Sequence, residues 1–142
     1  MEYPSPLADA SRMEPGRSHP SAVLTCLIAD DNRPIRAALQ EVLRAAGMEV
    51  VGVACSGADA IRLLKRHKPG AMILDLRLGE CDGLQLARRT ADISPDTAVI
   101  LYTSYASPQL ISEALGTGVK AVVLKEASAS KLLEVLLGIA AG

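Results

Sequence analysis

The sequence has few aromatic residues: its 142 positions hold three Tyr, no Trp and no Phe. RNA-recognition and single-strand-binding modules stack bases on aromatic side chains, so this scarcity argues against both classes. Neither sign of charge is in excess, because 15 Lys and Arg stand against 16 Asp and Glu, for a net charge of −1. Without a basic excess to neutralise a phosphate backbone, direct nucleic-acid binding by this chain is not expected.

Cysteine and long apolar runs are also scarce. Cys26, Cys55 and Cys81 are widely spaced and form no CxxC pair. Neither a disulfide framework nor a zinc site is predicted, and a reducing cytoplasm is the expected compartment. No apolar run reaches the ~18 residues of a membrane span, and the N-terminus lacks a signal-peptide pattern, so no membrane contact or secretion is expected.

The composition is that of a globular protein, with 49% hydrophobic and 22% charged residues. A domain typically has about 100–200 residues, which leaves room for one domain here. Residues 1–21 are rich in Pro and Ser and show no hydrophobic period, which predicts a disordered leader. Residues 22–142 are predicted to form the folded domain.

Short apolar runs alternate with amphipathic segments throughout the predicted domain. We expect strands at 23–29, 49–55, 71–76, 97–103 and 120–124, and helices at 34–46, 58–68, 84–92, 108–115 and 129–140. Strict alternation predicts an α/β fold, an open doubly wound five-stranded parallel sheet with helices on both faces. The flavodoxin-like strand order 2-1-3-4-5 satisfies this pattern.

Helix faces and helix ends can also be predicted. Asn32 or Asp31 is available to cap the first helix, Gly47 stops it, and Ser107 caps the fourth. Side chains expected on the inward faces are Ile35, Leu39, Val42, Leu43, Ala46, Ile61, Leu64, Leu84, Ala87, Ala91, Leu132, Leu133, Leu136, Leu137 and Ala140.

Polar residues stand where four of the five predicted strands end: Asp30 and Asp31 after the first, Asp75 in the third, Thr103 in the fourth and Lys125 after the fifth. Ligands of such sheets bind at the carboxyl ends of the strands, so these side chains are expected to meet at one edge. Three carboxylates repel one another unless a cation lies among them, and Mg²⁺ prefers such ligands together with phosphate oxygens.

The same set of residues suits phosphoryl chemistry. A carboxylate can attack phosphorus when positive charge supports the transition state, and Lys125 supplies a positive point charge. Thr103 supplies a hydroxyl donor for a phosphoryl oxygen. Each residue alone has a plain structural explanation: a helix cap for Asp30 and Asp31, a β-branched strand residue for Thr103, a solvated charge for Lys125. Those explanations do not account for their common edge.

Other polar side chains are expected to be structural or solvated. A redox role for Cys81 lacks a helper base or a neighbouring thiol. Basic residues of the second and third helices are expected to form solvated faces, namely Arg62, Lys65, Arg66, Lys68, Arg88 and Arg89.

The motifs, taken in order, resemble the receiver domains of two-component response regulators over residues 23–141. The matching pieces are Ile28-Ala29-Asp30-Asp31-Asn32, Ile73-Leu74-Asp75-Leu76, Asp82-Gly83, Leu101-Tyr102-Thr103-Ser104 and Leu124-Lys125-Glu126. The non-aromatic fifth strand, Lys125-Glu126-Ala127-Ser128 and the ending Leu136–Gly142 are most similar to receivers of the LuxR/NarL class.

This resemblance implies a role for each matching residue. Asp75 corresponds to the phosphoacceptor, Asp31 to a direct Mg²⁺ ligand and Asp30 to its water-mediated neighbour. The backbone carbonyl of Arg77 completes the metal ligands, and Mn²⁺ can substitute for Mg²⁺. Thr103 and Lys125 correspond to the residues that bind the phosphoryl oxygens and draw their loops inward. No enzymatic activity beyond self-phosphorylation and self-dephosphorylation is implied.

Three positions depart from the family pattern. Gly79 stands where Pro is usual, which predicts a looser loop after Asp75. Val122 stands where many receivers have an aromatic residue, which excludes an aromatic rotamer switch there, and only Tyr105 is placed to reach the mouth of the site. Arg77 and Tyr105 occupy the positions that shape water access, and their bulk predicts slow self-dephosphorylation.

The resemblance implies partners as well. They are a sensor histidine kinase or phosphotransfer protein, an output partner or missing effector domain, and a second copy of the chain if it forms a homodimer. The chain is either a fragment of a DNA-binding transcription regulator or a natural single-domain regulator. Two other classes stay open: a receiver-like scaffold without phosphotransfer, and a Mg²⁺-dependent phosphohydrolase, which would need a general acid where Arg77 stands.

Overall fold

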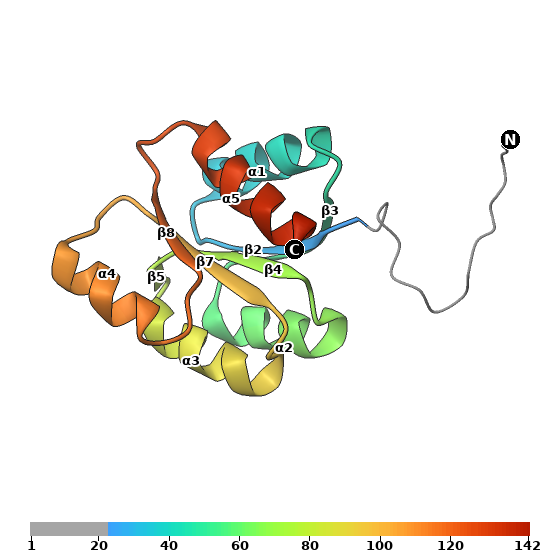
Figure 1. Ribbon diagram of the computed structural model, residues 1–142. Coiled ribbons are helices and arrows are strands. Elements are labelled where there is room, and N and C mark those ends of the chain that lie inside the picture. The colour runs from blue at the N-terminus through green and yellow to red at the C-terminus, as the bar shows by residue number, and fades with distance from the viewer. Residues whose placement is uncertain (1–22) are drawn as a thin grey trace, which may run out of the picture.

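The computed structural model describes residues 23–142, so the predicted leader at 1–21 lies outside the described residues. Its centre is a five-stranded parallel sheet in the order β3-β2-β4-β7-β8 (Figure 1). The strands are β2 (Thr25–Ala29), β3 (Glu49–Ala54), β4 (Ala71–Leu74), β7 (Ala98–Thr103) and β8 (Ala121–Leu124). Counted along the chain, this is the order 2-1-3-4-5, and the predicted flavodoxin-like fold is confirmed.

In the described part of the chain, five helices cover the two faces of the sheet (Figure 1). On one face lie α1 (Arg33–Ala45) and α5 (Ala129–Ala141), and on the other α2 (Gly57–His67), α3 (Gly83–Ile93) and α4 (Pro108–Leu115). No helix within residues 23–142 is long and apolar enough to cross a membrane.

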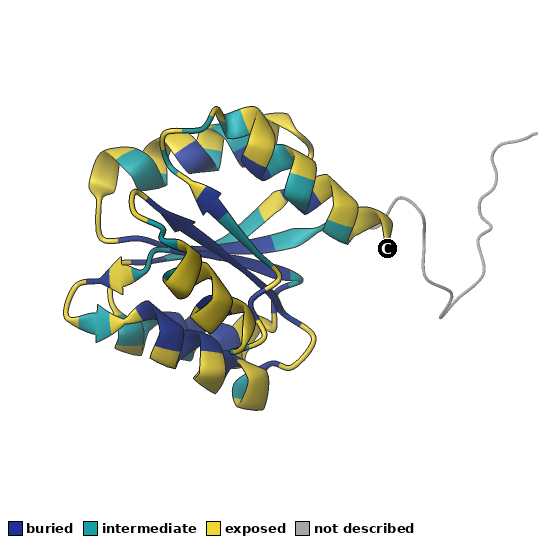
Figure 2. Ribbon diagram, turned by 60° about the vertical axis from the view of Figure 1, so that its left-hand side comes forward, coloured by how far each residue is buried: buried dark blue, intermediate teal, exposed yellow. Residues whose placement is uncertain are grey.

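Alternation along each strand divides the core into two layers. Leu27 and Ala29 of β2 pack with α2, α3 and α4, while Cys26 and Ile28 pack with α1 and α5. The central strands β4 and β7 are buried along their whole length, and the edge strands are partly accessible (Figure 2). Strands that are buried on both faces need apolar side chains at nearly every position, which accounts for the apolar runs in the sequence.

The predicted helix ends agree closely with the structure. Asn32 caps α1, because its Oδ1 accepts from the N–H of Ile35 over 3.1 Å. Ser107 caps α4 in the same way, with 3.1 Å from its Oγ to the N atom of Leu110. Gly47 follows α1 with a φ of +86°, a conformation that favours glycine at a helix end.

Four of the predicted inward side chains are instead exposed: Ala46, Ala91, Leu137 and Ala140. In α3 the buried set includes Leu86 and Thr90 rather than Ala91. The hydroxyl of Thr90 donates to the carbonyl of Leu86 over 2.8 Å, so this polar residue is buried with its hydrogen bond satisfied.

A short antiparallel hairpin follows β4 and was not expected. Its strands are β5 (Arg77–Leu78) and β6 (Cys81–Asp82), with Leu78 opposite Cys81. Gly79 and Glu80 form the two-residue turn, and Gly79 has a φ of +63°. A glycine with positive φ at the first central position is typical of a type II′ hairpin turn. The expectation of a looser loop is therefore wrong, because Gly79 allows a tight turn.

Candidate functional site

The predicted polar residues meet at the carboxyl ends of the central strands. The backbone ladder continues one residue past each strand: the N–H of Asp30 donates to Ala54 over 3.0 Å and that of Asp75 to Ala29 over 2.9 Å. The N–H of Lys125 donates to the carbonyl of Thr103 over 2.8 Å. These bonds fix the backbone of each residue next to its neighbour. The crevice lies where the strand order reverses, between β2 and β4.

Asp30, Asp31 and Asp75 together offer three carboxylate oxygens that lie within 4.8 Å of one another. Asp30 is buried, Asp75 is partly buried and Asp31 is exposed. Carboxylate oxygens are the ligands that hard divalent cations prefer, and an exposed member gives the ion a route from solvent. The donor set therefore fits Mg²⁺ or Mn²⁺.

Lys125 is the cation of this cluster. Its Nζ lies 2.9 Å from Oδ2 of Asp30 and 3.3 Å from Oδ2 of Asp75. Burial alone would lower the pKa of Lys125, but the hydrogen bond and charge of Asp30, together with Asp75, raise it above the ordinary value. Lys125 therefore carries a firmly held positive charge between two of the three carboxylates.

The surroundings of Asp75 raise the pKa of its carboxyl group. Burial, followed by the negative charge of Asp30, raises its pKa above the ordinary 3.8, while Lys125 opposes the shift. Lys125 therefore compensates the negative charge of ionised Asp75 only in part. A cation bound beside it would relieve both the desolvation and the repulsion.

Backbone N–H groups hold all three carboxylates. Oδ1 of Asp30 accepts from Asn32 over 2.8 Å, and Oδ2 of Asp31 accepts from Gly79 over 3.0 Å. Oδ1 of Asp75 accepts a longer bond, 3.4 Å, from Arg77. Sequence reasoning missed the bond from Gly79, because it depends on the hairpin turn. The metal-ligand role of the Arg77 carbonyl stays a prediction.

Thr103 and Tyr105 lie at the mouth of the site. With Asp75 and Lys125 they line a cleft of about 410 Å³. Thr103 is buried, and its Oγ1 accepts from the N–H of Tyr105 over 3.3 Å. Tyr105 is 66% exposed. Tyr102 is buried in the layer of α1 and α5, with its ring centroid 6.0 Å from Nζ of Lys125, so only Tyr105 reaches the mouth, as predicted.

Gly83 allows a close approach beneath Asp75. A Cβ atom at this position would lie 2.6 Å from the carbonyl oxygen of Leu76 and 2.7 Å from that of Asp75. The N–H of Gly83 donates to the Leu76 carbonyl over 2.7 Å. The start of α3 therefore supports the backbone on which Asp75 stands, and no larger residue fits there.

Known proteins are similar to this chain in sequence and in fold. The family model described as the response regulator receiver domain matches residues 26–137. The transcriptional regulatory protein YhcZ of Bacillus subtilis is 34% identical over 109 residues, which cover 76% of this chain and 51% of the relative. The chain spans about half the length of the curated relatives that share this match.

Solved structures agree with this match. The signal receiver domain of the response regulator NarL from Mycobacterium tuberculosis superposes with a TM-score of 0.77 at 28% identity, covering 84% of this chain and 98% of that one. A response regulator from Burkholderia pseudomallei, solved with a phosphorylated aspartic acid, a calcium ion and citrate, gives a TM-score of 0.72 at 28% identity. That match covers 78% of this chain and 64% of the other.

Proposed function

Because this chain belongs to the response regulator receiver domain family of two-component signalling, we propose that it is a phosphorylation-dependent switch with Asp75 as the phosphoacceptor. The convergence of Asp30, Asp31, Asp75 and Lys125 at one sheet edge carries this proposal. In this proposal residues 22–142 make up the receiver domain, and the family match at 26–137 supports that assignment.

The proposed reaction transfers a phosphoryl group to a carboxylate. An oxygen of Asp75 attacks phosphorus and forms an acyl phosphate, while the phosphorus–nitrogen bond of a phosphohistidine breaks and the imidazole leaves with its bonding electrons. A small donor such as acetyl phosphate loses acetate instead. Lys125, already 3.3 Å from Asp75, neutralises charge on the phosphoryl oxygens, and the Thr103 hydroxyl donates to one of them.

Asp31 and Asp75 would hold a divalent cation directly, with Asp30 through water and Arg77 through its carbonyl. When bound, Mg²⁺ or Mn²⁺ supplies positive charge that stabilises the phosphoryl oxygens during transfer. The three carboxylates within 4.8 Å support this ligand set. The N–H of Gly79 keeps Asp31 oriented toward the crevice, so the exposed ligand does not depend on the ion for its position.

The signal leaves the site through Thr103 and Lys125. Phosphorylation adds about −1.5 to −2 charges and draws both residues toward Asp75. They precede α4 and α5, so the face formed by 107–116, 120–124 and 129–140 is expected to change shape. Five of the six large hydrophobic side chains exposed within residues 23–142 lie on or beside this face: Tyr105, Ile111, Leu115, Leu124 and Leu137.

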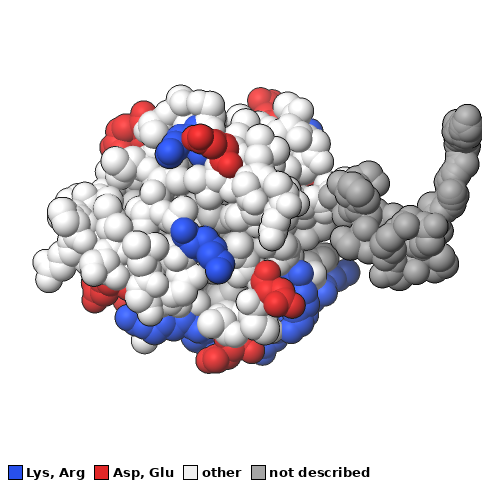
Figure 3. Space-filling view, viewed as in Figure 1, with Lys and Arg blue, Asp and Glu red and all other residues white. Residues whose placement is uncertain are grey.

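That face is suited to a protein partner. Few charged side chains lie over α4 (Figure 3), and contiguous exposed apolar side chains mark interaction surfaces. Partners of this proposal are a histidine kinase or phosphotransfer protein upstream and an output protein, effector domain or second copy of the chain downstream. Similarity to transcriptional regulators such as YhcZ supports transcription control as the output. The cytoplasm is the compartment of this proposal.

Intact mass tests the acceptor. Wild-type protein with Mg²⁺ and acetyl phosphate or phosphoramidate should gain the mass of one phosphoryl group. Asp75→Asn should gain none, while Asp59→Asn, which alters a surface carboxylate paired with Arg62, should behave as wild type. No gain in folded wild-type protein that binds Mg²⁺ would contradict the proposal and favour a receiver-like scaffold.

A further inference from the structure

We infer that the pocket between α2, α3 and the β5–β6 hairpin binds a small monocarboxylate with an apolar body, held at its charged end by Arg89. The pocket has a volume of about 440 Å³, within the range of about 300–1,000 Å³ found for small-molecule sites. It lies apart from the phosphoryl site, and the inference does not depend on the proposed function.

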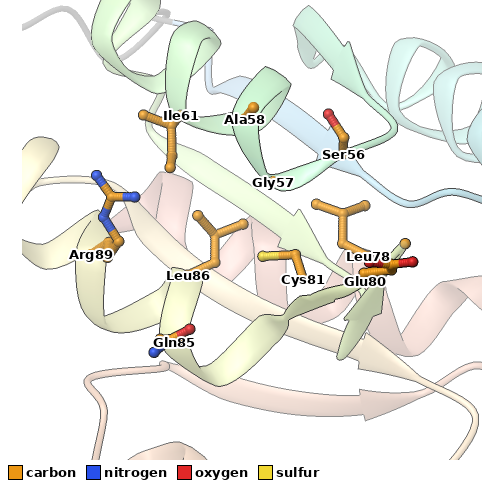
Figure 4. A pocket seen from close by; sticks show the side chains of 11 residues that line it. Ser56, Gly57, Ala58, Ile61, Leu78, Glu80, Cys81, Gln85, Leu86 and Arg89 are labelled. Atoms are coloured by element: carbon orange, nitrogen blue, oxygen red, sulfur yellow. The ribbon is translucent and has the colours of Figure 1, made fainter.

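The middle of the pocket is apolar. Ile61 of α2, Leu86 of α3 and Leu78 of the hairpin line it, and the thiol of Cys81 lies between Leu86 and Leu78 (Figure 4). Leu78 and Leu86 belong to the packed core, so two of these walls are fixed in position. A flat or branched apolar group placed there would lose contact with water on several sides.

Charged side chains stand at the two ends. Figure 4 shows Arg89 beside Ile61 at one end and Glu80 beside Leu78 at the other. Within residues 23–142, no carboxylate forms an ion pair with Arg89. A guanidinium makes bidentate contacts with carboxylates, so Arg89 is the group assigned to the charged end of the ligand. Glu80 at the opposite end disfavours a second negative charge, which selects monoanions.

Other basic side chains strengthen this preference. Lys65, Arg66 and Arg88 lie on the exposed faces of α2 and α3, and Figure 3 shows basic side chains with acidic ones among them along the lower edge of the molecule. A local excess of positive charge raises the concentration of small anions. Burial and Asp82 raise the pKa of the Cys81 thiol in the pocket, and the positive charge of Arg89 opposes that rise.

The hairpin wall connects the pocket to the crevice. Gly79, Glu80 and Cys81 line this pocket and also a second cavity on the other side of the hairpin, so the hairpin has open space on both sides. The same hairpin carries the N–H that donates to Asp31. A ligand in the pocket would therefore restrain a segment that positions a carboxylate of the crevice.

The three cysteines provide a direct test with the full chain. Cys81 lines the pocket, Cys55 is exposed and does not line it, and Cys26 is buried. The measurement is the rate of alkylation of each cysteine by iodoacetamide, followed by peptide mass spectrometry. The probes are 4-phenylbutyrate and its primary amide, which differ in charge but have the same apolar body. Neither Mg²⁺ nor a phosphodonor is needed, so failure here is separable from failure of the proposed function.

We expect 4-phenylbutyrate at millimolar concentration to slow alkylation of Cys81 several-fold and to leave Cys55 unchanged. The amide should protect weakly, and Arg89→Gln should abolish the difference between the two probes. Arg88→Gln, which changes an exposed neighbour outside the pocket, should retain it. Rapid alkylation of Cys26 would reveal a variant that has unfolded.

Equal protection by acid and amide, or protection that survives Arg89→Gln, would overturn the role of Arg89. Unchanged alkylation of Cys81 with saturating acid would overturn the site itself. If Cys81 reacts too slowly to compare, backbone amide shifts of Gly57 and Leu86 in the same titration decide the matter, since both residues line the pocket. Absence of shifts at both positions would equally overturn the site.

Discussion

Nζ of Lys125 lies 2.9 Å from Oδ2 of Asp30, although the two residues follow β8 and β2, which β7 and β4 separate. The lysine side chain spans the carboxyl ends of two intervening strands. Its ammonium and the Asp30 carboxylate are both largely buried, with 13% and 3% of their side chains exposed. Each charge of this pair therefore depends on the other for compensation.

Replacing Lys125 by Met should destabilise the metal-free protein. Removing one partner of a buried ion pair leaves the other charge uncompensated, which costs about 3 kcal/mol. Urea unfolding without metal is the measurement, and Mg²⁺ should restore part of the loss. The matched change is Lys131→Met, which breaks an exposed pair with Glu134 and should cost less than about 1 kcal/mol. Equal costs for the two variants would show that the buried pair with Asp30 adds no more to stability than an exposed pair.

Replacing Asp75 by Asn should stabilise the metal-free protein at neutral pH. Burial and Asp30 raise the pKa of Asp75 in the folded state above its ordinary 3.8. The folded chain thus holds this proton more tightly, so the contribution of Asp75 to stability is present below 3.8 and is lost as pH rises through the raised folded pKa.

Thermal unfolding of wild type and Asp75→Asn across acidic to neutral pH measures this effect. The difference between them should widen in favour of the variant as pH rises through that interval. Adding Mg²⁺ should reverse the ranking, because an ion that binds only the folded state at 100 times its Kd stabilises it by about 2.7 kcal/mol. A variant less stable than wild type at neutral pH without metal would refute the expectation.

Gly79→Pro should destabilise the chain more than Gly79→Ala. Alanine keeps the N–H that donates to Asp31 and pays about 1–2 kcal/mol for positive φ. Proline has no N–H and cannot adopt a φ of +63°, so the turn must rearrange and Asp31 loses its donor. Gly118→Ala, at a φ of +97° with open space around it, reports the strain alone. Equal losses for Gly79→Pro and Gly79→Ala in urea unfolding would show that the N–H contributes nothing.

Arg77→Ala and Tyr105→Ala should each accelerate loss of the phosphoryl group. Both side chains line the cleft next to Asp75, and a smaller residue admits water to the acyl phosphate. Decay of the phosphorylated mass after removal of the donor should be several-fold faster in either variant, and slow in wild type. Complete decay of wild type within seconds at neutral pH would contradict the proposed shielding.

The meeting of the site residues at one edge was predictable, because parallel strands all end at the same edge of a sheet. Asp30, Asp75 and Thr103 are polar residues that end buried apolar runs, and the carboxyl ends of parallel strands share one edge. Their convergence follows from that rule without any knowledge of side-chain packing. The resemblance to receiver domains, drawn from five short motifs, is confirmed by the family match.

Features that depend on tertiary contacts were not predictable from the sequence. Ala91 fits the helical period of apolar residues but is exposed, and Thr90 is buried beside it. Burial of Thr90 is tolerated because its hydroxyl donates to the carbonyl of Leu86, one turn earlier. Ala140 and Leu137 continue the apolar pattern of α5 but are exposed in the folded chain. The contact between Gly79 and Asp31 joins residues 48 positions apart. The sequence hints at it only through the glycine, which stands between the dipeptides Arg77-Leu78 and Glu80-Cys81.

The two-residue turn at Gly79 and Glu80 makes the segment after Asp75 a spacer of fixed length. One residue added between Leu78 and Cys81 would replace the two-residue turn by a longer loop with another backbone conformation. The Gly79 amide would then no longer be directed at Asp31. Homologous chains that keep this contact are expected to vary in side chains here but not in length.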